Sequence, residues 1–152
     1  MTRSERAREL HASGSNCAQS VLVAFAGDLG VDPKQAHRLA TTLGAGLGRR
    51  QLLCGAINGG ALALGAAFGN EEGSDLATKE LCYEIVRDYL RRVKEIAPST
   101  ECRVLLGVDI STVEGREESK RLGLTAKVCD PLIGKCTEIV EAILMERGRL
   151  PD

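Results

Sequence analysis

The stretch LLCGAINGGALALGAAF, from Leu52 to Phe68, decides the fold. It has 17 residues, with four glycines, five alanines and a single strongly polar side chain, Asn58. That length lies at the short limit for a membrane span, and the small residues make the stretch only weakly hydrophobic. We therefore predict that it forms the buried central helix of a soluble bundle rather than a membrane segment.

Helical patterns also dominate the rest of the chain, because no segment alternates apolar and polar residues with β-branched enrichment for more than a few positions. Cap and periodicity signals predict helices over 4–12, 16–29, 32–43, 75–97, 99–107 and 135–147. Residues 110–125 indicate a solvated connection or a weak surface helix. We predict an all-α, single-domain bundle covering residues 1–152, with about five to seven helices around the small-residue-rich central helix.

Composition excludes several classes of function. The chain has 20 basic and 21 acidic residues and only four aromatic side chains. It therefore lacks the excess positive charge that would neutralise phosphates and the aromatic side chains on which bases would stack, so we do not expect it to bind nucleic acid. The first ten residues are charged and contain no apolar core before a cleavage site, so nothing indicates export. A reducing cytoplasm is the expected location.

Small residues recur four apart on one side of the central helix, at Gly55 and Gly59 and at Ala56 and Gly60. They allow a neighbouring helix, a cofactor beside Cys54 or a second copy of the chain to approach the backbone closely. Tight helix packing, cofactor binding and a homodimer all remain open at this point. Asn58, one turn after Cys54, is expected to bond either a cysteine sulfur or cofactor, or the backbone of a neighbouring helix.

Four of the six cysteines lie at or near the start of a predicted helix: Cys17, Cys54, Cys102 and Cys136. A helix N-terminus favours a thiolate over a thiol, and the thiolate is the form that reacts and binds metal. Cys82 instead belongs to an apolar stripe and is expected to be a core residue.

The spacing of the four cysteines predicts no local metal site, because 36, 47 and 33 residues separate them. Only the folded chain can bring them together. Basic residues close to them in sequence would favour an anionic site: Arg49, Arg50, Arg103 and Lys135. The two histidines, His11 and His37, are expected to be exposed, so we do not expect either of them to act with a cysteine in catalysis or to bind metal.

The order of the cysteine motifs carries a resemblance to a known family. Asn16-Cys17-Ala18-Gln19 comes first, then a Gly-rich loop and Cys54-Gly55-Ala56-x-x-Gly59, then Glu101-Cys102-Arg103, and finally a cysteine that opens the last helix. This pattern resembles the C_GCAxxG_C_C family of redox-active proteins over nearly the whole chain. The resemblance implies that Cys17, Cys54, Cys102 and Cys136 form the site. Cys129 would replace Cys136 if the last helix begins earlier than predicted.

The resemblance and the four thiol donors together favour a redox protein with an iron–sulfur cluster, possibly [2Fe-2S]. Its ligands would be Cys17, Cys54, Cys102 and Cys136. The cluster would exchange electrons with a redox partner protein. A similar cysteine set occurs in split-Soret cytochromes, which carry an iron–sulfur centre, although this chain lacks their Cys-x-x-Cys-His haem attachment. One alternative is a thiol–disulfide oxidoreductase with Cys54 as nucleophile and another of the four resolving the mixed disulfide. The others are a structural zinc site and incidental buried thiols. Whether the protein is an enzyme stays open.

Overall fold

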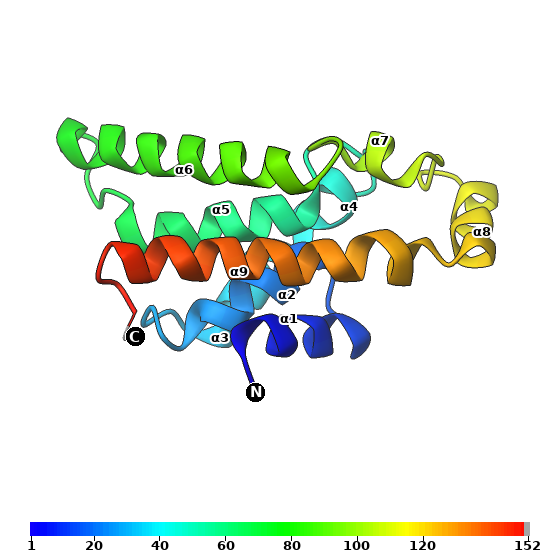
Figure 1. Cartoon of the computed structure of the whole chain (residues 1–152), viewed down its shortest axis with the longest axis horizontal. Helices are drawn as coiled ribbons and strands as arrows, with labels where there is room; N and C mark the ends of the chain where they lie inside the picture. Colours follow the sequence, from blue (N-terminus) through cyan, green and yellow to red (C-terminus); the bar gives the residue numbers. More distant parts are fainter. Residues whose placement is uncertain (151–152) are drawn as a thin grey trace.

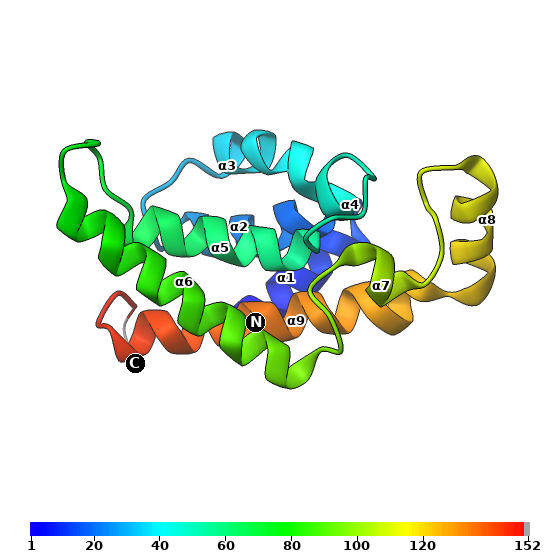
Figure 2. The same cartoon turned by 90° about the horizontal axis from the view of Figure 1, so that it is seen from above.

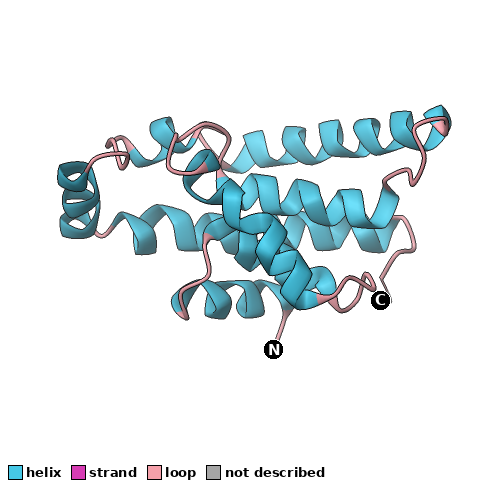
Figure 3. Cartoon of the chain, turned by 180° about the vertical axis from the view of Figure 1, so that it is seen from behind, coloured by secondary structure: helices cyan, strands magenta, loops and turns pink. Residues whose placement is uncertain are grey.

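The computed structural model describes residues 1–150, and within them the chain consists of helices joined by loops and turns (Figure 3). The one other feature among these residues is an isolated antiparallel β-bridge between Leu53 and Glu101. The all-α prediction is confirmed. The helical elements are α1 (Arg3–Ala12), α2 (Cys17–Ala26), α3 (Pro33–Ala40), η1 (Thr41–Leu43), α4 (Gly44–Leu47), α5 (Gly55–Phe68), α6 (Leu76–Ile96), α7 (Cys102–Leu106), α8 (Val113–Leu122), η2 (Thr125–Cys129) and α9 (Asp130–Glu146).

Eight of these elements are right-handed α-helices, one more than the largest number predicted. The additional helix is a stretch that capping hydrogen bonds make helical although it buries no side chain. The α8 helix has no buried residue, but the Thr112 side chain accepts a hydrogen bond from the Gly115 N–H at its start, and Gly123 ends it in a left-handed conformation. Local capping therefore forms a helix where the apolar pattern is weak.

The helix α5 lies at the centre of the molecule (Figure 1). It packs against α2 on one side and against α6 and α9 on the other, and α1 covers α2 and α9. Figure 2 shows α3 and α6 on opposite sides of α5. Among residues 1–150, no helix has both the length and the apolar character that crossing a membrane requires.

Two glycines of α5 make this packing possible. A Cβ atom at Gly59 would lie 2.5 Å from the Ala18 carbonyl oxygen of α2, and one at Gly60 would lie 2.1 Å from the Tyr89 hydroxyl of α6. That hydroxyl donates a hydrogen bond of 3.1 Å to the Ile57 carbonyl oxygen. The small residues thus serve close helix packing on two sides of α5.

The last helix begins at Asp130, so the predicted start near Lys135 is wrong. Pro131 lies in the first turn of α9, where its missing N–H costs no hydrogen bond. The π-helical turn η2 runs directly into it from Thr125 to Cys129. A short π-helical segment changes the direction in which side chains point and is often found at functional sites.

Residues 45–49 form a left-handed turn. Ala45, Leu47 and Arg49 have φ values of 53°, 77° and 66°, and the glycines between them, Gly46 and Gly48, are left-handed as well. L-residues with side chains resist this conformation by about 1–2 kcal/mol each. Hydrogen bonds hold the turn closed, including those from the Leu52 N–H to the Gly46 carbonyl and from the Gln51 N–H to the Ala45 carbonyl, at 2.9 and 3.1 Å.

The left-handed turn generates a prediction about Gly46. A Cβ atom there would lie 2.5 Å from the Leu52 backbone nitrogen, so Gly46→Ala is expected to lower the free energy of unfolding by about 3 kcal/mol through strain and overlap. Gly48→Ala is the matched control, because Gly48 is also left-handed but has open space around it, and it should cost only about 1 kcal/mol. Urea denaturation measures both. Equal costs would show that the turn is not held against Leu52.

Candidate functional site

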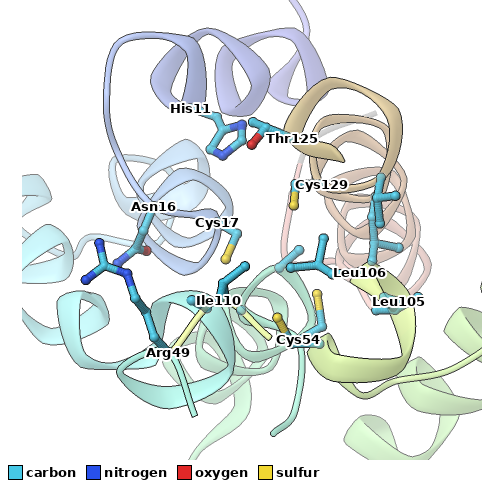
Figure 4. A pocket seen from close by; sticks show the side chains of 16 residues that line it. His11, Asn16, Cys17, Arg49, Cys54, Leu105, Leu106, Ile110, Thr125 and Cys129 are labelled. Carbon is cyan, nitrogen blue, oxygen red and sulfur yellow. The ribbon is translucent and has the colours of Figure 1, made fainter. Parts of the chain in front are cut away.

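Four thiols from distant parts of the chain line one cavity of about 330 Å³, which we call the cysteine cavity. They are Cys17, Cys54, Cys102 and Cys129. Figure 4 shows the Cys17, Cys54 and Cys129 side chains around the same space. All six cysteines of the chain are free thiols.

The β-bridge places Cys54 next to Cys102. The Cys54 N–H donates a hydrogen bond to the Thr100 carbonyl oxygen at 2.8 Å, and the Cys102 N–H donates to the Leu52 carbonyl oxygen at 2.7 Å. These bonds flank the pairing of Leu53 with Glu101. Asn58 supports the same segment, since its side-chain amide donates to the Leu53 carbonyl oxygen at 3.1 Å, rather than to a sulfur or to a neighbouring helix.

Cys17 is held at the start of α2 by a capping box. The Asn16 side chain accepts a hydrogen bond from the Gln19 N–H, and the Gln19 side chain accepts one from the Asn16 N–H, each at 2.8 Å. The sulfur of Cys17 then lies against Gly55, where a Cβ atom would come within 2.1 Å of it. Gly55 therefore leaves the space that the Cys17 sulfur fills.

The fourth thiol on the cavity wall is Cys129, not Cys136. Because α9 begins at Asp130, Cys136 lies well inside that helix and is completely buried in the core. Cys129 is the last residue of the η2 turn and borders the cavity. The sequence favours Cys136 over Cys129 because it predicts that the last helix begins near Lys135, five residues later than it does. Cys82 is half-buried on α6 and does not line the cavity.

Burial dominates the acidity of the cavity thiols. Burial, the larger cause, and the charge of the neighbouring Cys17 together raise the pKa of Cys54 and of Cys129 to about 12 and that of Cys102 to about 11. The N–H groups of Ile57 and Ala56 at the start of α5 lower the pKa of Cys54, as expected for a helix N-terminus, but burial outweighs them. Without a bound cation these three groups stay protonated at neutral pH.

Gln51 and His11 contribute to the site without having been predicted. Gln51 is 4% exposed, and its side chain lowers the pKa of the Cys102 thiol. Its side-chain amide donates to the Val108 carbonyl oxygen and accepts from the Ile110 N–H. His11, expected to be exposed, is half-buried and lines the cysteine cavity near Thr125, and burial lowers its pKa (Figure 4). The only sequence signal for His11 is its position six residues before Cys17, across a Gly14 turn.

Of the basic residues and histidines discussed from the sequence, some border the cysteine cavity and others do not. Arg49 borders the cysteine cavity, whereas Arg50, Arg103 and Lys135 lie outside it. His37, also expected to be exposed, is half-buried and bonded to Ser15 and Gln19 away from the cavity. One of the four cations near the cysteines in sequence is therefore near the thiols in space.

The four cavity thiols are the donors in this site that could hold a metal centre. Among residues 1–150, no group of three or more His, Cys, Asp or Glu side chains is already arranged around a single metal position, and tetrahedral zinc would need four donors around one centre. In a two-iron cluster the four thiolates are shared between two irons, so only two must approach each one. Cys17, Cys54, Cys102 and Cys129 line one cavity of about 330 Å³ and are the residues that could hold such a group.

Comparison with known proteins gives one match. The model of the family described as "Putative redox-active protein (C_GCAxxG_C_C)" matches residues 15–143, which include all four cavity cysteines. Comparison with curated proteins and with solved structures gives no significant match.

The contact between Gly55 and Cys17 generates a prediction. Gly55→Ala should displace the Cys17 sulfur, lower the free energy of unfolding by about 1–3 kcal/mol and change the rate at which Cys17 reacts with iodoacetamide. Gly65→Ala is the control on the same helix, because nothing lies within 4 Å of its Cβ position, and it should stabilise the protein by up to about 1 kcal/mol. Unchanged Cys17 alkylation in Gly55→Ala would contradict the packing.

The raised thiol pKa values predict a pH dependence of the metal-free protein. A thiol titrates near 9.0 when unfolded but near 12 at Cys54 and Cys129, so the native state favours the protonated form. The resulting stability is fully present below pH 9 and is lost as pH rises from 9 toward 12. Urea denaturation under reducing conditions should show this fall, and the fall should be smaller in Cys129→Ala, which removes one such group. Equal slopes in both proteins would be inconsistent with the burial argument.

Proposed function

This chain belongs to the C_GCAxxG_C_C family of redox-active proteins, and on that basis we propose that Cys17, Cys54, Cys102 and Cys129 ligate an iron–sulfur cluster for electron transfer or redox sensing. The convergence of these four thiols on one cavity carries the proposal. When bound, the cluster supplies one-electron redox chemistry. A [2Fe-2S] cluster matches four cysteine ligands.

The electrostatics of the cavity favour a bound cationic centre. Four adjacent thiolates would repel one another, and burial penalises each charge, which is why the pKa values of Cys54, Cys102 and Cys129 are raised. Metal ions that replace the thiol protons relieve both costs, and binding then releases protons to solvent. The cavity is thus suited to holding thiolates only together with a metal centre.

The same electrostatics disfavour the thiol–disulfide alternative. At a pKa of about 12, Cys54 is a thiolate in on the order of one molecule in 10⁵ at pH 7, and a disulfide exchange enzyme needs an attacking thiolate. The structural zinc alternative would use the same four thiols, and metal analysis distinguishes it from the cluster. The cluster is our first proposal and zinc is the second.

Residues around the cavity have separate tasks in this proposal. The backbone N–H groups of Ala56 and Ile57 and the side chain of Gln51 stabilise negative charge on Cys54 and Cys102 respectively. Leu105, Leu106 and Ile110 form apolar wall that limits water around the sulfur atoms (Figure 4). Hydrogen bonds to sulfur and exclusion of water are the means by which a protein tunes a cluster's reduction potential.

Single substitutions test the ligand set. Each of Cys17→Ser, Cys54→Ser, Cys102→Ser and Cys129→Ser should lower the iron and inorganic sulfide bound per chain at least tenfold after anaerobic reconstitution. Mutation of a residue that only supports a metal ligand typically costs about 10–100-fold in metal affinity, and loss of the ligand itself should cost at least as much. Iron and sulfide analysis, with the visible absorption spectrum, measures the loss.

Cys82→Ser and Cys136→Ala are the matched controls, since neither thiol lines the cavity. Both should keep wild-type iron and sulfide, and circular dichroism should show that every variant is folded. Loss of the cluster in Cys136→Ala but not in Cys129→Ser would overturn the proposed ligand set. Dependence on only two of the cysteines would instead favour dithiol chemistry.

A further inference from the structure

A second pocket of about 250 Å³ adjoins the cysteine cavity and contains three arginines, and we call it the arginine pocket. It is lined by Arg49, Arg50, Gln51, Arg103, Asp109 and Ser111. Arg49 borders both this pocket and the cysteine cavity. The two spaces therefore meet at one side chain.

The arginine pocket carries an excess of positive charge. Three arginines and a single carboxylate line it. That carboxylate, of Asp109, already accepts hydrogen bonds from the N–H and hydroxyl of Ser111 and lies 3.5 Å from Arg103. Within residues 1–150, no carboxylate oxygen lies within 4 Å of the Arg49 or Arg50 guanidinium. Two of the three cations thus have no internal counter-charge in the described chain.

The backbone fixes the positions of these arginines. Arg49 ends the left-handed turn with a φ of 66°, and Arg103 is tied to it through its N–H, which donates to the Gln51 carbonyl oxygen at 3.1 Å. Buried Gln51 in turn anchors the Val108–Ile110 segment that carries Asp109. Strained conformations that persist in a fold are frequently found where function needs fixed side chains.

We propose that the arginine pocket binds the phosphate group of a small molecule. A phosphate dianion accepts paired hydrogen bonds from the planar guanidinium group, which explains why arginine rather than lysine would serve here. Held there, the molecule reaches the mouth of the cysteine cavity past Arg49. Phosphate binding at this pocket does not depend on the proposed cluster.

The test is an NMR titration of the full chain with inorganic phosphate, compared with sodium chloride at equal ionic strength. Saturable shifts are expected for the backbone amides of Arg50, Gln51, Arg103 and Ser111. Arg50→Gln and Arg103→Gln should each weaken phosphate binding roughly tenfold, because each removes charge-assisted hydrogen bonds. Arg50→Gln breaks no hydrogen bond or ion pair within the described chain, so it tests binding independently of any loop change caused by Arg103→Gln.

Arg87→Gln is the matched control, since Arg87 is exposed on α6, outside the arginine pocket, and its loss should leave binding unchanged. The titration is repeated on Cys54→Ser, which removes a proposed cluster ligand, and phosphate binding should persist there whatever becomes of the cluster. Shifts that sodium chloride reproduces, or that Arg50→Gln leaves intact, would overturn the phosphate site. Binding of polyglutamate without binding of phosphate would also overturn it, in favour of an acidic protein surface.

Discussion

The structure depends on the missing Cβ atoms of one helix. At Gly55, Gly59 and Gly60, α5 brings its backbone against the Cys17 sulfur, the Ala18 carbonyl and the Tyr89 hydroxyl, each closer than a side chain would allow. Glycine within a helix costs about 1 kcal/mol of helix propensity, so packing must offset roughly 3 kcal/mol for these three residues. The close approach to α2 and α6 provides that packing, and it also places Cys17 beside the start of α5.

The second constraint is the short bridge between Leu53 and Glu101. It joins two segments that are almost fifty residues apart in sequence, and it places Cys54 and Cys102 on adjacent paired segments. The left-handed turn ahead of it carries conformational strain, which its own hydrogen bonds and the buried Gln51 side chain counteract. The same left-handed turn also places Arg49 at the rim of the cysteine cavity. The strained turn and the bridge that follows it therefore position both the thiols and this surface charge.

Much of the fold follows from sequence patterns, and the site follows only in part. The glycine and alanine spacing from Leu52 to Phe68 predicts the central helix, because small residues in an apolar run have few other uses. Cys17, Cys54 and Cys102 follow motifs at helix starts and reach the cavity. The sequence predicts Cys129 only as an alternative to Cys136, because the π-helical turn before Asp130 has no sequence signature that separates it from a loop. The role of Gln51 depends on its bonds to Val108 and Ile110, more than fifty residues further along the chain, which local sequence does not encode.

The most direct test of the central claim is the metal content of the unmodified protein. After anaerobic purification, one sample would be analysed for iron, inorganic sulfide and zinc, and its visible absorption spectrum recorded. We predict iron and sulfide in equal amounts, with sulfur-to-iron charge-transfer bands, because four thiolates share one buried cavity. Zinc without sulfide, or a colourless protein that stays metal-free after reconstitution with iron and sulfide, would contradict the cluster.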